Sequence, residues 1–433
     1  MPAPTVLYTI ILEWLYAMGC VTHETSRRAL AVQVTAVLSG QSLQPSARMR
    51  ALLSAVTVPA RQRYLRVARA LDRPSLSPER LTPFLVRAVL ALVAPDKQGY
   101  THVAMDTVRC GNWEILTLGI VWHSRMVPIG WAVLPYPWPK GQFTPTVGGL
   151  VQQVAQAWPK DRPAHLLADR GFPSNGLFAT LKSVGWDWTI RLQARNWVVV
   201  EGKCQPVREL LAPTPLGTWN CTTGTFGSRK DAVIGQLVIG RPKRYVPSHQ
   251  RNPSSQDHWQ RQQERRAKHI ASKHPRQAPD ASVETAGWLV LFTSLSSHRY
   301  ALSSYRRRWA TEGSYRDAQG GWDGKHGWDL EPVAAATPTS EAVTRLVGLW
   351  ALSALIQMWV GDQVMHGPAP VRAVPDQWAT THRLSIWARG RMALTDPTRA
   401  LETWLKITMN RGAHRIASAP DPSPKGQVYA NVA

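Results

Sequence analysis

Three acidic side chains occupy positions where carboxylates could do chemistry: Asp106 in HVAMDTV, Asp169 in HLLADRGF and Glu312 in RRRWATEGSYR. Each aspartate ends an apolar run typical of a β-strand, and strand ends are where a sheet displays reactive groups. Three carboxylates from distant parts of a chain can hold two divalent metal ions about 3.5–4 Å apart for phosphoryl transfer. The ordinary alternatives are turn capping for the aspartates and, for Glu312, a surface ion pair with Arg308 or Arg316.

The charge of the chain favours a polyanionic partner. Its 433 residues include 51 Lys+Arg and 28 Asp+Glu, a formal net charge of +23. Such a field favours nucleic acid, although charge alone does not separate DNA from RNA or an anionic membrane. Arginines beside Glu312 would hold phosphates while the carboxylates hold metal ions.

The spacing around Glu312 resembles a known signature. Tyr305, Arg308 and Glu312 match Y-x2-R-x3-E-x6-K, the Tyr-Arg-Glu-Lys signature of DDE transposases from bacterial insertion sequences, in insertion-sequence family four. Gln319 stands where the signature has lysine. On an α-helix the offsets 0, 3, 7 and 14 fall on one face, so these four side chains could address one DNA strand.

Two further blocks carry the resemblance. MDTV around Asp106 and ADRGF around Asp169 are similar to the family's acidic blocks, and a β-rich insertion between the second aspartate and the glutamate is also a family feature. The resemblance covers about residues 100 to 330. It implies an α/β fold, an RNase H-like mixed-sheet catalytic core with a β-rich insertion, flanked by helical N- and C-terminal regions.

The resemblance also implies an activity: cut-and-paste transposition with Asp106, Asp169 and Glu312 as catalytic metal ligands. Two Mg²⁺ ions, or Mn²⁺ as a substitute, would serve cleavage and strand transfer, and the freed 3′-hydroxyl would form a hairpin end. Tyr305 and Arg308 would grip the strained strand. A flipped base would stack on one of four candidate tryptophans: Trp197, Trp288, Trp309 and Trp322.

Further DNA contacts are expected near the acidic blocks. Gln319 can donate a hydrogen bond in place of the missing lysine, and Arg316 or Lys325 can supply the lost charge. Arg170, directly after Asp169, is a further candidate. The polar, basic stretch from Arg241 to Arg276 has few aliphatic residues, so we expect a mobile loop that contacts the DNA backbone.

Composition and hydrophobic patterning divide the chain into five regions. Residues 1–95 read as a helical domain with possible DNA binding, 96–194 as the first part of the catalytic core, and 195–285 as the β-rich insertion with its basic loop. Residues 286–365 complete the core. Residues 366–433 form a helical C-terminal region and tail.

Two apolar runs are expected to be buried helices rather than targeting or membrane segments. TVLYTIILEWLYAMGCV lacks a basic leading region and contains Glu13, and the run from Leu346 to Val360 is shorter than the roughly 20 residues of a membrane span. The four cysteines are far apart, which disfavours a zinc site or disulfide framework. We therefore expect a cytoplasmic protein with no membrane partner.

The expected partner is double-stranded DNA bearing terminal inverted repeats, bound by a homodimer. Two alternatives stay open. The chain could be a transposase-derived DNA-binding protein that has lost activity, which the Gln319 replacement would favour, or an RNase H-like metal-dependent nuclease or resolvase.

Overall fold

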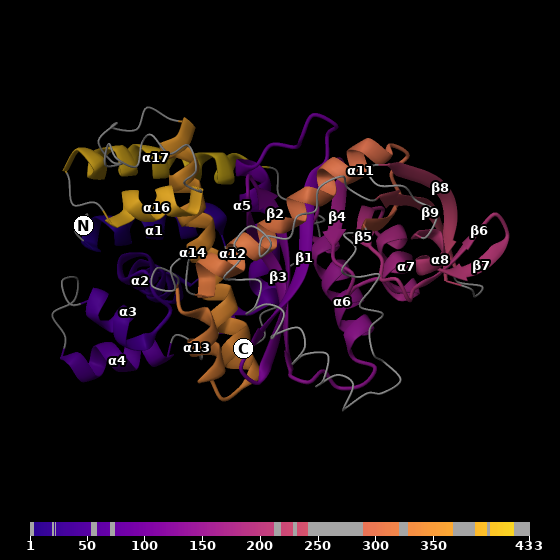
Figure 1. The fold of residues 1–433 in the computed structure, drawn as a ribbon. Coiled ribbons are helices and arrows are strands. Elements are labelled where there is room, and N and C mark those ends of the chain that lie inside the picture. The colour runs from indigo at the N-terminus through magenta and orange to yellow at the C-terminus, as the bar shows by residue number, and fades with distance from the viewer. Residues whose placement is uncertain are drawn as a thin grey trace, which may run out of the picture. The chain divides into compact units, whose positions relative to one another are not determined.

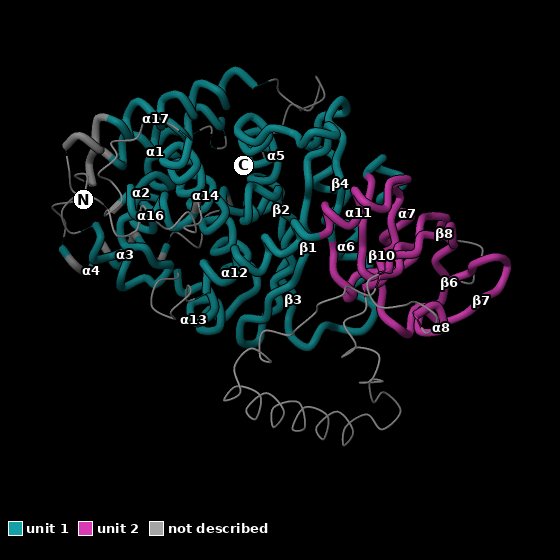
Figure 2. Tube along the Cα trace, turned by 45° about the horizontal axis from the view of Figure 1, so that its top comes forward, with its two compact units in different colours: residues 1–167, 180–186, 306–433 teal, residues 168–179, 187–305 magenta. Residues whose placement is uncertain are grey.

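The computed structural model describes most of the chain, and its residues form a mixed α/β structure with helices toward both ends (Figure 1). The described residues are 4–19, 21, 23–52, 59–69, 74–211, 218–227, 232–240, 289–319, 328–366, 386–395 and 399–419. They divide into two compact units (Figure 2): unit 1 comprises residues 1–167, 180–186 and 306–433, and unit 2 comprises 168–179 and 187–305. The basic stretch Arg241–Arg276 lies outside the described residues.

The N-terminal part of unit 1 is helical. Its elements are α1 (Pro4–Met18), α2 (Glu24–Gly40), α3 (Pro45–Ala51), α4 (Ala60–Ala68), the short 3-10 helix η2 (Pro74–Leu76) and α5 (Pro78–Leu92). In α1 the apolar residues recur at helical spacing, and Leu7, Ile11, Trp14 and Met18 are all buried. The prediction of a buried helix at this position is confirmed.

Three antiparallel strands follow, as predicted from their apolar patterning. They are β1 (Thr101–Cys110), β2 (Trp113–Trp122) and β3 (Arg125–Pro135). Two-residue turns join them, and the first residue of each turn, Gly111 and His123, has a positive φ of 62° and 54°. Tight hairpin turns require this left-handed backbone because it matches the twist of the strands.

Asp106 lies within β1 rather than at its end, so the expectation of a strand-end aspartate is wrong at this position. It pairs with Thr117, and the residues beyond it, Thr107 to Cys110, continue the ladder with β2. The apolar run stops at Met105 because β1 leaves the core there: residues 101–105 are buried, whereas 106–108 are half-buried. The end of the apolar run at Met105 therefore marks where β1 becomes less buried, and the strand continues to pair with β2 beyond it.

After β3 the chain forms α6 (Phe143–Gln156), β4 (Ala164–Ala168) and α7 (Asn175–Ser183). In unit 1 the strand order is β3-β2-β1-β4. All five residues of β4 are buried, as expected for a short continuous apolar strand. Asp169 directly follows its last residue, so the prediction that this aspartate ends a strand is confirmed.

Unit 2 is built around an antiparallel sheet in the order β5-β10-β9-β8-β6-β7. Four aromatic rings, Phe178, Trp188, Phe226 and Phe292, pack together in its core. Its elements are β5 (Asp187–Arg191), β6 (Trp197–Val200), β7 (Lys203–Pro206), α8 (Val207–Leu211), β8 (Trp219–Phe226), β9 (Val233–Gly240), β10 (Leu289–Thr293) and α11 (His298–Tyr305). The antiparallel strands expected near residues 197, 219 and 233 are present.

The rest of unit 1 is helical and includes its central helix. The elements are the 3-10 helix η4 (Arg306–Trp309), α12 (Ala310–Gln319), α13 (Leu330–Ala335), α14 (Ser340–His366), α16 (Ile386–Thr395) and α17 (Arg399–Ser418). Helix α14 packs against β3, α2, α5 and α16. It is buried on all sides from Leu346 to Gly361, which explains why its sequence is apolar without a helical stripe.

Helix α14 is longer than the apolar run predicted, because polar turns extend it at both ends. Among the described helices it is long and apolar enough to cross a membrane. However, 89% of its most apolar window is buried inside the protein. This is the burial of a core helix.

Glycine 390 tests the packing of α16 on α14. A Cβ added to Gly390 would lie 1.8 Å from the carbonyl oxygen of Gln357, which is backbone and has no room to move. We expect Gly390→Ala to destabilise the protein by about 1–3 kcal/mol, because the two helices must separate. The matched control is Gly149→Ala in α6, where nothing lies within 4 Å of the added Cβ and alanine should stabilise by up to about 1 kcal/mol. Urea denaturation measures both; a Gly390→Ala protein as stable as the control would contradict the packing.

Candidate functional site

The Asp106 carboxylate is held by donors from its own strand, from η4 and from α12. One oxygen, Oδ1, accepts the backbone N–H of Thr107 at 2.9 Å. The other, Oδ2, accepts the hydroxyl of Thr311 at 2.9 Å and lies 3.3 Å from a guanidinium nitrogen of Arg308. All three contacts come from donors, which suits a carboxylate because both of its oxygens accept hydrogen bonds.

Arg308 bridges the two predicted catalytic carboxylates of unit 1. One nitrogen of its guanidinium faces Asp106 and the other lies 3.0 Å from an oxygen of Glu312. The side chain of Arg308 is only 5% exposed, whereas that of Glu312 is 41% exposed. A surface i,i+4 pair would also place Arg308 beside Glu312, but it would not bury the arginine or share it with a residue 202 positions away. The structure therefore joins Asp106, Arg308 and Glu312 in one cluster.

Helix α12 is fixed on β3 close to this cluster. The hydroxyl of Ser314 accepts the N–H of Met126 at 2.7 Å and donates to its carbonyl at 3.0 Å. Arg125 forms an ion pair with Asp317; burial raises the pKa of Asp317, and Arg125 offsets this only in part. A Cβ on Gly313 would lie 2.7 Å from the Arg125 guanidinium, so glycine allows the close approach. These contacts set the position of Glu312.

Tyr315 ties the same helix to the strands beneath Asp106. Its hydroxyl is hydrogen-bonded to Thr117 of β2 and donates to the backbone carbonyl of Asp106 at 3.1 Å. Burial, together with the nearby Asp106 charge, raises the pKa of Tyr315 well above its ordinary value. Tyr315 therefore stays neutral and acts as a fixed donor that positions Asp106 from behind.

Asp169 and Tyr305, the remaining signature partners, meet within unit 2. The Tyr305 hydroxyl donates to Asp169 at 3.2 Å, and a guanidinium nitrogen of Arg191 lies 3.9 Å from the same oxygen. The Tyr305 ring is buried against Val238 and Leu291. Tyr305 therefore holds a predicted metal ligand in unit 2, as Arg308 does in unit 1.

The predicted signature helix is interrupted. Tyr305 ends α11, Arg308 lies in η4 and Glu312 lies in α12, so the expected single α-helical face contains a 3-10 segment. Such a segment inside a helical run often marks a hinge or a functional position. Here it coincides with the boundary between the two units, which falls between Tyr305 and Arg306.

A basic hollow of about 460 Å³ opens beside Glu312 in unit 1. Four arginines line it together with the ring of Trp309, which is 56% exposed. These arginines are Arg125, Arg306, Arg307 and Arg316. An exposed indole among guanidinium groups beside a carboxylate is suited to a nucleic acid strand, with phosphates on the arginines and a base on the ring.

The other predicted contacts are distributed over both units. Arg316 is exposed and Gln319 is half-buried on α12. Arg170 belongs to unit 2, where its carbonyl accepts the Gln193 side chain at 2.6 Å. Lys325 lies outside the described residues. Of the four candidate tryptophans, Trp309 and Trp197 are exposed, whereas Trp288 and Trp322 are not described.

The sequence analysis did not predict three residues that contact the aspartates. Thr311 and Tyr315 contact Asp106, and Arg191 lies beside Asp169. A signal existed for the first two, because they lie within three residues of Glu312 in the quoted stretch. Arg191 ends a short strand that was not predicted, so nothing in the sequence placed it near Asp169.

Comparison with known proteins does not assign the chain to a family. No family model matches the sequence, and no curated protein matches it either.

Replacing Arg308 tests the carboxylate bridge. Arg308→Met keeps the length of the side chain but leaves Asp106 and Glu312 without their shared cation. We expect the free energy of unfolding to fall by about 1–3 kcal/mol, less than for a fully buried pair because Glu312 is partly solvated. The matched control is Arg306→Met in the same 3-10 helix, which is exposed and should change stability by less than about 0.5 kcal/mol. Equal effects of the two changes in urea denaturation would contradict the bridge.

Proposed function

We propose that the protein is a DNA transposase that cleaves the ends of an insertion sequence and joins them to new DNA. The observation that carries the proposal is the cluster of Asp106, Arg308 and Glu312, because it joins the first acidic block to the signature arginine and glutamate over 200 residues of sequence. The Tyr305 contact with Asp169 supports it from unit 2. In this proposal the three carboxylates act together as one metal site.

The fold of unit 1 is compatible with the RNase H-like core that the proposal requires. An antiparallel meander, β1 to β3, is followed by α6 and then β4 beside β1. Fold alone does not imply function, so this support is secondary to the site residues.

The proposed ligands fit hard divalent cations. Carboxylate oxygens are the donors that Mg²⁺ and Mn²⁺ prefer, and the half-buried Asp106 and Glu312 offer such oxygens on either side of Arg308. Two Mg²⁺ ions bound there would supply activation of the attacking water or DNA 3′-hydroxyl and stabilisation of the leaving oxygen during in-line displacement. Asp106, Asp169 and Glu312 would hold these ions, with Mn²⁺ as a substitute.

In this proposal Arg308 exchanges partners. Without a divalent ion its guanidinium neutralises Asp106 and Glu312. With divalent cations compensating the two carboxylates, Arg308 would bind a DNA phosphate, for which its planar fork is suited. Arg308 would then have two binding partners: the carboxylates in the metal-free protein and a DNA phosphate in the metal-bound complex.

The remaining proposed DNA contacts are made by basic side chains near the carboxylates. The arginines of the basic hollow bind backbone phosphates beside Glu312, and Arg170 does so beside Asp169. Gln319 donates a hydrogen bond where the signature has lysine, and Lys325 or Arg316 supplies the missing charge. The substrate is double-stranded DNA with terminal inverted repeats, held by a homodimer.

The glutamate of the signature gives the decisive test. Glu312→Gln keeps the size of the side chain and its hydrogen bonding but removes the charge, so cleavage of DNA carrying the repeats that flank the coding region should fall at least 100-fold, while binding to that DNA survives. The assay compares supercoiled and linear products with Mg²⁺ present and absent.

The control is Glu331→Gln, which removes an exposed carboxylate on α13 and should leave cleavage unchanged. Undiminished cleavage by the Glu312→Gln protein would reject the proposal. The same assay separates the alternatives: binding without cleavage by the unaltered protein indicates an inactive DNA-binding derivative, and cleavage independent of the flanking repeats indicates a nuclease.

A further inference from the structure

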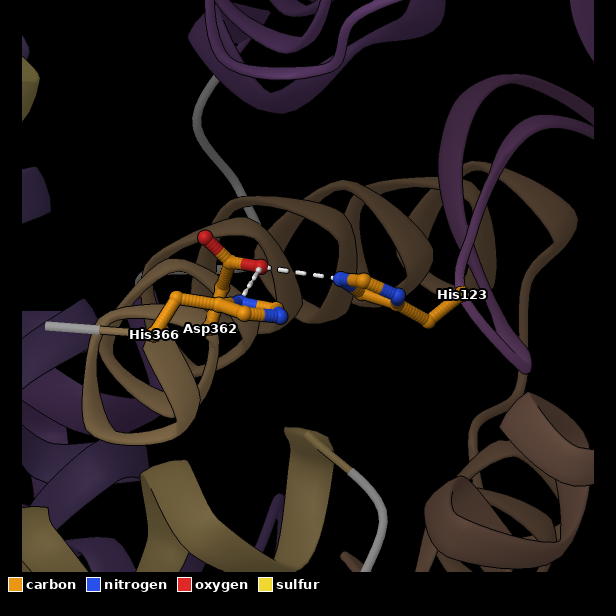
Figure 3. Close-up of side chains that lie close together, drawn as sticks. All are labelled: His123, Asp362 and His366. Atoms are coloured by element: carbon orange, nitrogen blue, oxygen red, sulfur yellow. Dashed lines mark hydrogen bonds and ion pairs between the residues drawn. The ribbon is translucent and has the colours of Figure 1, made fainter. Parts of the chain in front are cut away.

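A cluster of side chains that could hold a metal ion lies in unit 1 and shares no residue with the three carboxylates. His123, from the turn between β2 and β3, and His366, from the last turn of α14, both contact Asp362 (Figure 3). His123 Nε2 is 2.9 Å from Asp362 Oδ1, and His366 Nδ1 is 3.2 Å from the same oxygen. One candidate ligand atom from each residue lies within 4.8 Å of the others.

The geometry of each element brings these groups together. Asp362 and His366 are four residues apart on α14, so they share a face of the helix. His123 occupies the left-handed region with φ 54°, a position where asparagine or glycine would suit the turn better than histidine. Backbone requirements therefore do not account for the imidazole.

The cluster is open on one side and closed on the other. The side chain of Asp362 is only 15% exposed, whereas those of His123 and His366 are 41% and 55% exposed. The two imidazole rings stack, with centroids 5.4 Å apart and planes 24° apart. Stacking fixes both rings beside the carboxylate, so a ligand from solvent meets groups that are already oriented.

Two imidazoles and one carboxylate are a donor set for transition metals rather than for Mg²⁺. Zn²⁺ takes nitrogen and oxygen ligands about 2.0–2.2 Å away in a tetrahedron, whose ligand atoms are then about 3.4 Å apart. The distances from Asp362 Oδ1 to His123 Nε2 and His366 Nδ1, 2.9 and 3.2 Å, are close to this ligand–ligand distance. Small side-chain shifts would therefore bring the three atoms to tetrahedral positions around an ion. Three protein ligands leave a fourth position for water.

We propose that His123, Asp362 and His366 bind a transition-metal ion of the Zn²⁺ class, which ties the β2–β3 turn to the end of α14. The turn continues into Ser124 and Arg125, which line the basic hollow with Glu312. Arg125 also pairs with Asp317 of α12. The bound ion therefore stabilises the turn against which α12 packs. The inference does not depend on the transposase proposal.

Metal binding is measured on the full-length protein with Zn²⁺ by equilibrium dialysis and with Co²⁺ by visible absorption. The variants are His123→Asn, whose asparagine tolerates the left-handed turn, Asp362→Asn and His366→Asn. The chain has 13 histidines, so the informative quantity is the difference in bound metal between the unaltered protein and each variant. The matched control is His414→Asn, an exposed histidine of α17 whose neighbour one turn on is Ser418 rather than a carboxylate.

We expect each of the three variants to bind one fewer Zn²⁺ ion, or to bind it at least about 100-fold more weakly, since loss of an outer-shell group alone costs about 10–100-fold. The His414→Asn protein should match the unaltered protein, and excess Mg²⁺ should not displace the ion. Zn²⁺ should raise the melting temperature of the unaltered protein more than that of the variants, whose metal-free melting temperatures report that they are folded. Equal Zn²⁺ binding by all four variants, or no tetrahedral Co²⁺ spectrum in the unaltered protein, would overturn the proposal and leave a hydrogen-bonded cluster only.

Discussion

A guanidinium group that is almost wholly removed from water needs compensating charge, and Arg308 takes it from Asp106 and Glu312. This requirement links a strand near the start of the sheet to a helix 200 residues later. The contacts of α12 with β3 through Ser314 and Arg125 serve the same arrangement, because they hold Glu312 within reach of the arginine. The position of α12 on the sheet of unit 1 can be understood in part from the charge compensation of Arg308.

The cluster also explains how a cationic surface can carry a carboxylate site. Glu312 faces a hollow lined by four arginines, yet its own partner is the buried Arg308. In the proposed function, the positive charge around the site would attract a polyanion and divalent cations would replace Arg308 as the partner of the acids. His123 of the proposed transition-metal site lines the same hollow, so a second kind of candidate ligand lies beside it.

Much of the fold follows from hydrophobic patterning. The strands β1 to β3, helix α6 and strand β4 were predictable because each has an apolar run of the right period and length, bounded by turn residues. The position of Asp106 in the middle of β1 was not predictable, because the sequence does not show whether a strand ends where its apolar run ends. The Arg308–Glu312 pair follows from helical spacing, whereas the third member, Asp106, depends on long-range packing. His123 and Asp362 are 239 positions apart, and only the folded chain brings them together.

The central proposal is that Asp106, Asp169 and Glu312 act as one metal site. The most direct measurement is anomalous X-ray diffraction from crystals of the protein with Mn²⁺ and DNA carrying the flanking repeats. The account predicts two Mn²⁺ ions about 3.5–4 Å apart, with all three carboxylates as ligands and Arg308 moved from them to a phosphate. Mn²⁺ bound without Asp169, or Arg308 still between Asp106 and Glu312 in the metal-loaded complex, would contradict it.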